Sequence, residues 1–72
     1  MMLFLFESTH AVMKAERICI KNDVYYKIVP VPRSISSQCG MALEVKKESE
    51  DILSKLLEEN KLNFEKYFNY KK

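Results

Sequence analysis

The spacing of the apolar residues changes several times along this chain, and the order of these spacings limits the folds open to it. A continuous apolar run, Leu3 to Phe6, is typical of a strand buried on both faces. Ser8 and Thr9 follow, and both are good N-cap residues for a helix. Apolar side chains then recur at helical spacing, at Ala11, Val12, Ala15, Ile18 and Cys19. We therefore expect an amphipathic helix, which the turn residues Asn22 and Asp23 should end.

The next segment, Val24 to Val31, is rich in β-branched and aromatic residues, which favour a strand. Pro30 and Pro32 constrain its place in a sheet, because proline cannot donate a hydrogen bond to a neighbouring strand. We therefore expect this strand to lie at the edge of the sheet or to end near Pro30.

The second half of the chain repeats the change of spacing. Residues Met41 to Val45 predict a third, short strand. Ser49 is the expected N-cap of a second helix that ends at Asn60, and Phe64 to Tyr70 is the expected fourth strand. The apolar stripe predicted for this helix comprises Ile52, Leu53, Leu56 and Leu57.

This order of elements, βαββαβ, predicts an α+β fold of the ferredoxin-like type. Its four strands would form an antiparallel sheet with both helices on one face, since the crossover connections are right-handed. At 72 residues, we expect residues 1–72 to form a single domain.

Charge and hydropathy exclude several classes of function. The 12 basic and 10 acidic residues give a net charge of +2, too weak a bias to indicate nucleic-acid binding. Glu7 ends the first apolar run too early for a secretory signal, and no segment approaches the length of a membrane span. We therefore expect a cytoplasmic protein with no membrane partner. In that reducing compartment, both cysteines should be free thiols.

The expected loop between the second and third strands contains the residue with the best case for chemistry, Cys39. In the inferred topology this loop and the start of the first helix lie at the same end of the sheet. The positive end of a helix dipole lowers the pKa of a nearby thiol, and a thiolate is the reactive form. Positive charge or hydrogen-bond donors from Arg33 and His10 would act in the same direction. The other candidate binding residues are Thr9, Ser34, Ser36, Ser37 and Gly40.

Other chemistries lack the residues they need. The chain has no Cys-x-x-Cys pair, its Cys and His residues do not have the spacing of zinc ligands, and its single glycine cannot build a phosphate-binding loop. We expect no metal, no cofactor and no complete enzyme active site. Cys19 lies on the apolar stripe of the first helix and is interpreted as a core thiol. An inert loop cysteine remains the alternative interpretation of Cys39.

The segment around Cys39 resembles a family of small bacterial proteins described as selenium/sulfur carrier-like. The family pattern is V-P-x-x-[IL]-S-S-x-C-G-x-[AS]-[IL], and residues 31–43 match it. The start of the chain is also similar, with an apolar strand followed by Ser8 to Ala11. The resemblance implies that Cys39 holds a persulfide or perselenide. It also implies two partners, a cysteine desulfurase-like donor and an acceptor protein.

A second class of function stays open beside the carrier. The chain could be a small protein–protein interaction or regulatory module in which Cys39 is structural or senses redox state. Its proline-containing edge strand, or its last strand, could then pair with a second copy to form a homodimer. An enzyme is the least favoured class, because general acid–base residues are few.

Overall fold

The computed structural model describes residues 2–31 and 41–68, and these residues form the six expected elements together with one short 3-10 turn. In chain order the elements are β1 (Met2–Leu5), α1 (Thr9–Lys21), β2 (Tyr26–Pro30), β3 (Met41–Val45), the 3-10 turn η1 (Lys47–Ser49), α2 (Glu50–Glu59) and β4 (Glu65–Phe68). None of the described helices is long and apolar enough to cross a membrane.

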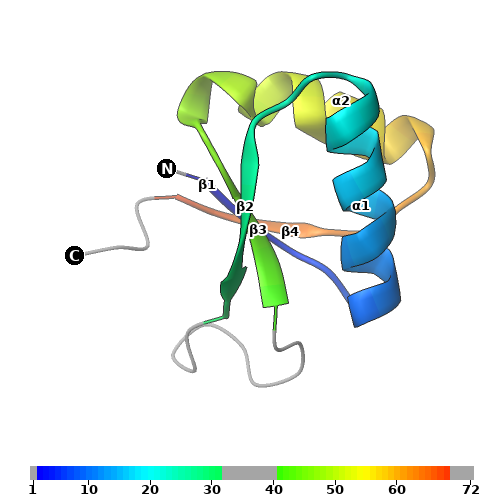
Figure 1. Cartoon of the computed structure of the whole chain (residues 1–72), viewed down its shortest axis with the longest axis vertical. Helices are drawn as coiled ribbons and strands as arrows, with labels where there is room; N and C mark the ends of the chain where they lie inside the picture. The colour runs from blue at the N-terminus through cyan, green and yellow to red at the C-terminus, as the bar shows by residue number, and fades with distance from the viewer. Residues whose placement is uncertain (1, 32–40, 69–72) are drawn as a thin grey trace.

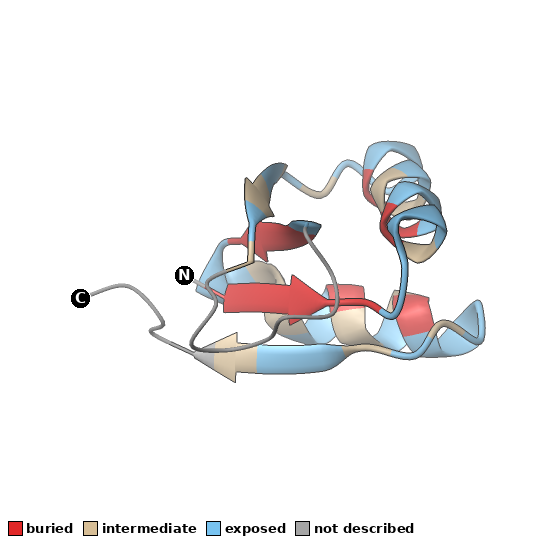
Figure 2. Ribbon diagram, turned by 90° about the horizontal axis from the view of Figure 1, so that it is seen from below, coloured by how far each residue is buried: buried red, intermediate tan, exposed pale blue. Residues whose placement is uncertain are grey.

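The four described strands form one antiparallel sheet in the order β2-β3-β1-β4 (Figure 1). Leu5 of β1 lies opposite Ala42 of β3 on one side and Glu65 of β4 on the other. Figure 2 shows β1 and β3 as the buried centre of the sheet, with the outer strands β2 and β4 more exposed. The fold is the predicted α+β, ferredoxin-like arrangement.

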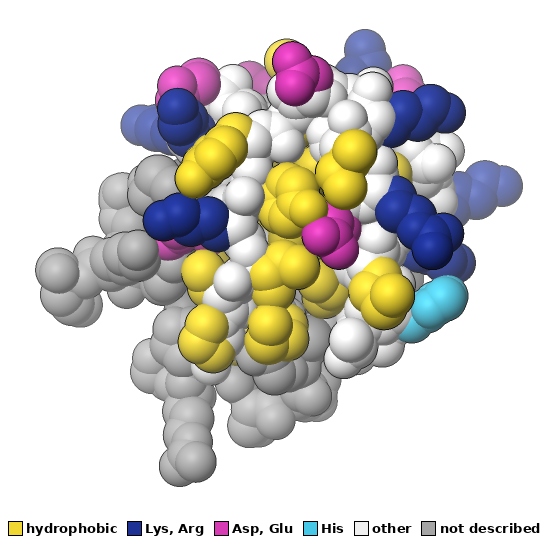
Figure 3. All heavy atoms as spheres, viewed as in Figure 1, with side chains coloured by type: hydrophobic (Ala, Val, Ile, Leu, Met, Phe, Trp, Pro, Cys, Tyr) yellow, Lys and Arg dark blue, Asp and Glu magenta, His cyan; other side chains and the backbone are white. Residues whose placement is uncertain are grey.

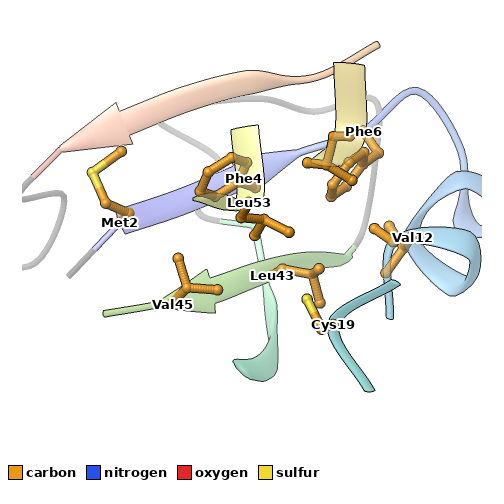
Figure 4. Close-up of a cluster of buried hydrophobic side chains, with 10 residues drawn as sticks. Met2, Phe4, Phe6, Val12, Cys19, Leu43, Val45 and Leu53 are labelled. Carbon is orange, nitrogen blue, oxygen red and sulfur yellow. The ribbon is translucent and has the colours of Figure 1, made fainter. Parts of the chain in front are cut away.

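Both helices pack on one face of the sheet and enclose the main core (Figure 4). Side chains alternate across β1, so Met2 and Phe4 face this core. The rings of Phe4 and Phe64 lie 5.5 Å apart between centroids, which ties the approach to β4 into the core. The buried members of the cluster are Met2, Phe4, Phe6, Val12, Ala15, Cys19, Leu43, Val45, Leu53 and Leu57.

The opposite face of the sheet carries a second, smaller apolar cluster. Leu3, Leu5 and Ala42 are buried there, with Tyr67 packed against them. β1 is therefore buried on both faces, as its unbroken apolar run predicted. Glu44 is also buried, and it lies opposite Leu3 of β1 and Lys27 of β2 in the strand register.

The residues predicted to begin and end α1, and the effect predicted for the prolines on β2, are confirmed. Ser8 is the N-cap of α1, and Asn22 is its C-cap. Asp23 then turns the chain with a positive φ of 59°, a conformation that Asp tolerates better than most residues. β2 is an edge strand and ends at Pro30, so both consequences expected from the prolines hold.

Ser49 is the N-cap residue of α2, as predicted, but two details expected of this helix were wrong. Ser49 makes no side-chain capping bond, because the preceding 3-10 turn gives it helical angles (φ −92°, ψ −3°) where an N-cap residue needs an extended backbone. Ile52 is not in the buried stripe, since it is 59% exposed while the next residue, Leu53, is fully buried. One residue turns a helix by about 100°, and α2 is oriented so that Leu53 faces the sheet while Ile52 faces solvent.

Candidate functional site

The predicted Cys39 loop is flanked by β2, which ends at Pro30, and by β3, which begins at Met41, both close to the predicted positions. Pro30, the last residue of β2, pairs with Met41, the first residue of β3. This pair lies at the end of the sheet where β1 finishes, because Ala42 is opposite Leu5. The predicted loop residues themselves lie outside the described part of the chain and stay predictions. They are Arg33, Ser34, Ser36, Ser37, Cys39 and Gly40.

Helix α1 begins at this same end of the sheet (Figure 1). Its N-cap Ser8 accepts a hydrogen bond from the Ala11 amide at its Oγ (3.2 Å), and its carbonyl accepts one from the Val12 amide (3.1 Å). Helix geometry leaves the amides of Thr9 and His10 without an intrahelical acceptor. The first turn of α1 holds no acidic side chain, so no carboxylate within this turn offsets the positive end of its dipole.

The connection between α2 and β4 also lies at the end of the sheet where α1 begins. Asn63 Nδ2 donates a hydrogen bond of 3.3 Å to Glu7 Oε2, which joins residues 56 positions apart in the sequence. The start of α1 therefore lies beside this connection. Thr9 and His10 are both exposed here, so the two described members of the predicted binding set are accessible to solvent.

Cys19 is the one cysteine that the described residues include, and it is fully buried as a free thiol. Figure 4 shows it on the inner side of α1 beside Leu43. Burial, with a smaller contribution from the charge of Glu16, raises the pKa of the Cys19 thiol to about 11. A thiol of this kind stays protonated at neutral pH and is shielded from reagents. The interpretation of Cys19 as a core thiol is confirmed.

One surface hollow was not predicted from the sequence. Between α1 and the end of α2 the structure has a hollow of about 330 Å³, lined by Lys14, Arg17, Ile18, Asn60 and Leu62. Lys14 and Arg17 lie between the apolar positions of the amphipathic helix and were not among the predicted site residues. With His10 and Lys21 they recur every three or four residues, and this helical spacing of basic residues could have been found in the sequence. Within the described residues, no group of three or more His, Cys, Asp or Glu side chains could hold a metal ion.

A comparison with known protein families gives one match that spans nearly the whole chain. The family is described as "Putative Se/S carrier protein-like", and its model matches residues 1–69. The matched region includes both cysteines. No curated protein and no solved structure matches the chain significantly.

Proposed function

The chain belongs to the Se/S carrier protein-like family, and from this premise we propose that it carries a sulfur or selenium atom on the thiol of Cys39. The proposal has the protein act as a carrier between two partners and not as an enzyme. The donor would be a cysteine desulfurase-like protein, and the acceptor a second protein that docks in turn. We also place the carrier in the cytoplasm, where a thiol stays reduced.

The observation that carries this assignment is the burial of Cys19. The sequence has two cysteines, and a carrier needs one nucleophilic sulfur that its partners can reach. Cys19 lies fully buried in the core with its pKa raised to about 11, so it meets neither requirement. The burial of Cys19 therefore supports the choice of Cys39 as the thiol for the function that the family name describes.

The described surroundings of the loop support the same assignment. Pro30 and Met41, where β2 and β3 meet the undescribed segment, lie at the end of the sheet where α1 begins. A helix N-terminus lowers the pKa of a thiol placed near it. Thr9 and His10 would then supply backbone amides, and Arg33 and the serines further donors, to stabilise a terminal anionic sulfur.

The proposed step needs no oxidant. The Cys39 thiolate attacks the terminal sulfur of a persulfide on the donor, forming a new S–S bond while the donor S–S bond breaks. The electron pair of the broken bond leaves with the donor cysteine as its thiolate. The same exchange then passes the terminal sulfur to the acceptor, and a perselenide would react in the same way.

Mass spectrometry of the intact protein tests the carrier. The protein is incubated with a cysteine desulfurase and cysteine, and we expect an added mass of one sulfur atom. The addition should be absent in Cys39→Ser and retained in Cys19→Ala. Alanine is the better control here, because a serine hydroxyl at the buried position 19 would have no assured hydrogen-bond partner.

Two results would count against the carrier. One is an unmodified protein after incubation, together with a Cys39 thiol that titrates like free cysteine. The other is a sulfur addition that survives in Cys39→Ser, which would move the reactive group elsewhere. Replacing cysteine with selenocysteine, and the desulfurase with a lyase that acts on it, separates sulfur from selenium as the cargo.

A specific observation also favours the second candidate, an interaction module. β2 is an edge strand, so one side of its backbone has no neighbouring described strand. Ile28 on β2 and Met13 and Ile20 on α1 are exposed, and Figure 3 shows hydrophobic side chains gathered between these two elements. Pairing of two β2 edges would give a homodimer, which sedimentation analysis would detect as a mass of two chains.

A further inference from the structure

Helix α1 carries its basic side chains in a single stripe. His10, Lys14, Arg17 and Lys21 are all exposed. At about 100° per residue they fall within an arc of about 60° around the helix. Figure 3 shows Lys and Arg side chains along the edge of the molecule formed by α1, with the histidine at its lower end.

No described carboxylate forms an ion pair with these basic side chains. The ion pair found among the described residues joins Lys66 of β4 to Glu50 of α2, away from α1. The acidic residue within α1, Glu16, accepts a hydrogen bond of 2.6 Å from Tyr26 on the opposite side of the helix. The stripe therefore leaves positive charge available to a partner.

One side of the stripe borders the hollow of about 330 Å³ between α1 and the end of α2. Its apolar lining residues, Ile18 and Leu62, pack against the main core. Asn60 is held in position, since its Nδ2 donates a hydrogen bond of 2.8 Å to the Leu56 carbonyl. This volume is at the lower limit for small-molecule pockets, about 300 Å³, and suits one or two side chains better than a larger ligand.

The other side of the stripe is apolar and exposed. Met13 is 50% exposed and Ile20 is 66% exposed, although both belong to residue types that are usually buried. A basic stripe between two apolar borders combines charge with apolar contact area. That combination is typical of a protein interface, whereas nucleic-acid surfaces are dominated by positive charge.

We propose that this α1 surface binds an acidic segment of a partner protein. Carboxylates of the segment would contact Lys14 and Arg17. One apolar side chain of the segment, placed between those carboxylates in its sequence, would enter the hollow over Ile18 and Leu62. Charge complementarity and the apolar lining of the hollow favour such a partner, and this binding goes beyond the carrier role because it does not depend on Cys39. Lys14 lies about 8 Å along α1 from its first residue, so a bound segment stays near the end of the sheet where β2 finishes.

A titration followed by 15N–1H correlation NMR tests the proposal directly. The probe is a twelve-residue peptide of glutamates with a central leucine. We expect the largest shift changes at the amides of Lys14, Arg17, Ile18 and Leu62. A peptide with serine in place of leucine should bind at least threefold more weakly, and a peptide with lysine in place of glutamate should not bind.

Charge-reversal variants provide the matched comparison. Lys14→Glu with Arg17→Glu should weaken binding of the acidic peptide at least tenfold. Lys47→Glu with Lys55→Glu makes the same change in net charge at exposed positions on η1 and α2, and should change binding less than twofold. Thermal unfolding followed by circular dichroism verifies that both double variants are folded.

Four results of the binding measurements would overturn the proposal. They are no shift changes on α1, equal losses in the two double variants, equal binding of the leucine and serine peptides, and tighter binding of a single-stranded oligonucleotide of equal charge. Peptide-induced shifts that merely report dissociation of a dimer, seen as a change in sedimentation, would also overturn it. All these readouts measure binding, so they remain separate from any failure of sulfur transfer to Cys39.

Discussion

Tyr26 Oη donates a hydrogen bond of 2.6 Å to Glu16 Oε2, and this contact ties the edge strand β2 to the middle of helix α1. The bond holds the phenol proton, and with smaller contributions from burial and from the charge of Glu16 it raises the pKa of Tyr26 to about 12. The same carboxylate contributes to the raised pKa of Cys19. Glu16 thus favours the protonated form of two neighbouring side chains.

Alkaline titration should reveal this bond. The pKa of Tyr26 is about 12 in the folded protein, against an ordinary value of 10.0. Its contribution to stability is therefore fully present below pH 10 and is lost as the pH rises towards 12. Absorbance of the tyrosinate ion should show a late step that disappears in Tyr26→Phe and moves to lower pH in Glu16→Gln. Tyr25→Phe, at an exposed position, should leave the late step in place.

The ion pair between Lys66 and Glu50 predicts a dependence at acid pH. Lys66 Nζ lies 2.6 Å from Glu50 Oε2, and this hydrogen bond lowers the pKa of the Glu50 carboxyl. Its stabilising effect is present above the ordinary pKa of glutamate and is lost as the pH falls through the lowered folded value. Urea denaturation should find Glu50→Gln less stable than the parent at pH 7, with the difference reduced at pH 3.

The control for that measurement is Glu59→Gln, at the exposed end of α2. Removing a carboxylate from the C-terminal turn of a helix should not lower stability, because the negative end of the dipole disfavours it. If Glu50→Gln and the parent differed by the same amount at both pH values, the ion pair would not be the source of the stability.

Neighbouring apolar residues on α2 should respond very differently to truncation. Leu53 is fully buried in the main core, whereas Ile52 is 59% exposed. Leu53→Ala should reduce the free energy of unfolding by about 2–5 kcal/mol, because it removes buried apolar contacts and leaves a cavity. Ile52→Ala should change it by about 0.5 kcal/mol or less. Equal losses in chemical denaturation would mean that the orientation of α2 is different.

The two serines before the helices also form a matched pair. Ser8 caps α1 through its side chain, with its Oγ 3.2 Å from the Ala11 amide. Ser49 precedes α2 and makes no side-chain capping bond. Ser8→Ala should therefore cost about 1 kcal/mol of stability, while Ser49→Ala should be nearly neutral. A larger loss for Ser49→Ala in thermal unfolding would contradict this assignment of the caps.

The local parts of the fold were predictable from particular residues. The prolines limited β2 to an edge and ended it at Pro30, because proline lacks an amide proton. The error at Ser49 arose because a cap depends on backbone angles, and these were decided by the preceding 3-10 turn. The fourth strand was predicted as Phe64 to Tyr70, and the described strand is Glu65–Phe68, with residues 69–70 outside the described part.

Less of the candidate site could be predicted. The topology placed the end of β2 and the start of β3 at the end of the sheet where α1 begins, and the strand register together with the order of the elements confirms that placement. The role of Cys39 rests on its motif and on the family match, and it stays a prediction. The hollow beside Lys14 and Arg17 was missed, because it combines residues from α1 with residues beyond α2 that are far apart in the sequence.

The sequence by itself determined the order and type of the elements, since hydrophobic spacing, turn residues and prolines act over a few neighbouring positions. Only the tertiary structure decided which apolar residues are shielded, because burial depends on how helices pack against the sheet. The packing buries Leu53 and leaves Ile52 exposed, and it places Cys19, on the inner side of α1, in the main core. The full burial of Cys19 confirms it as a core thiol, which its place on the apolar stripe of the helix had predicted.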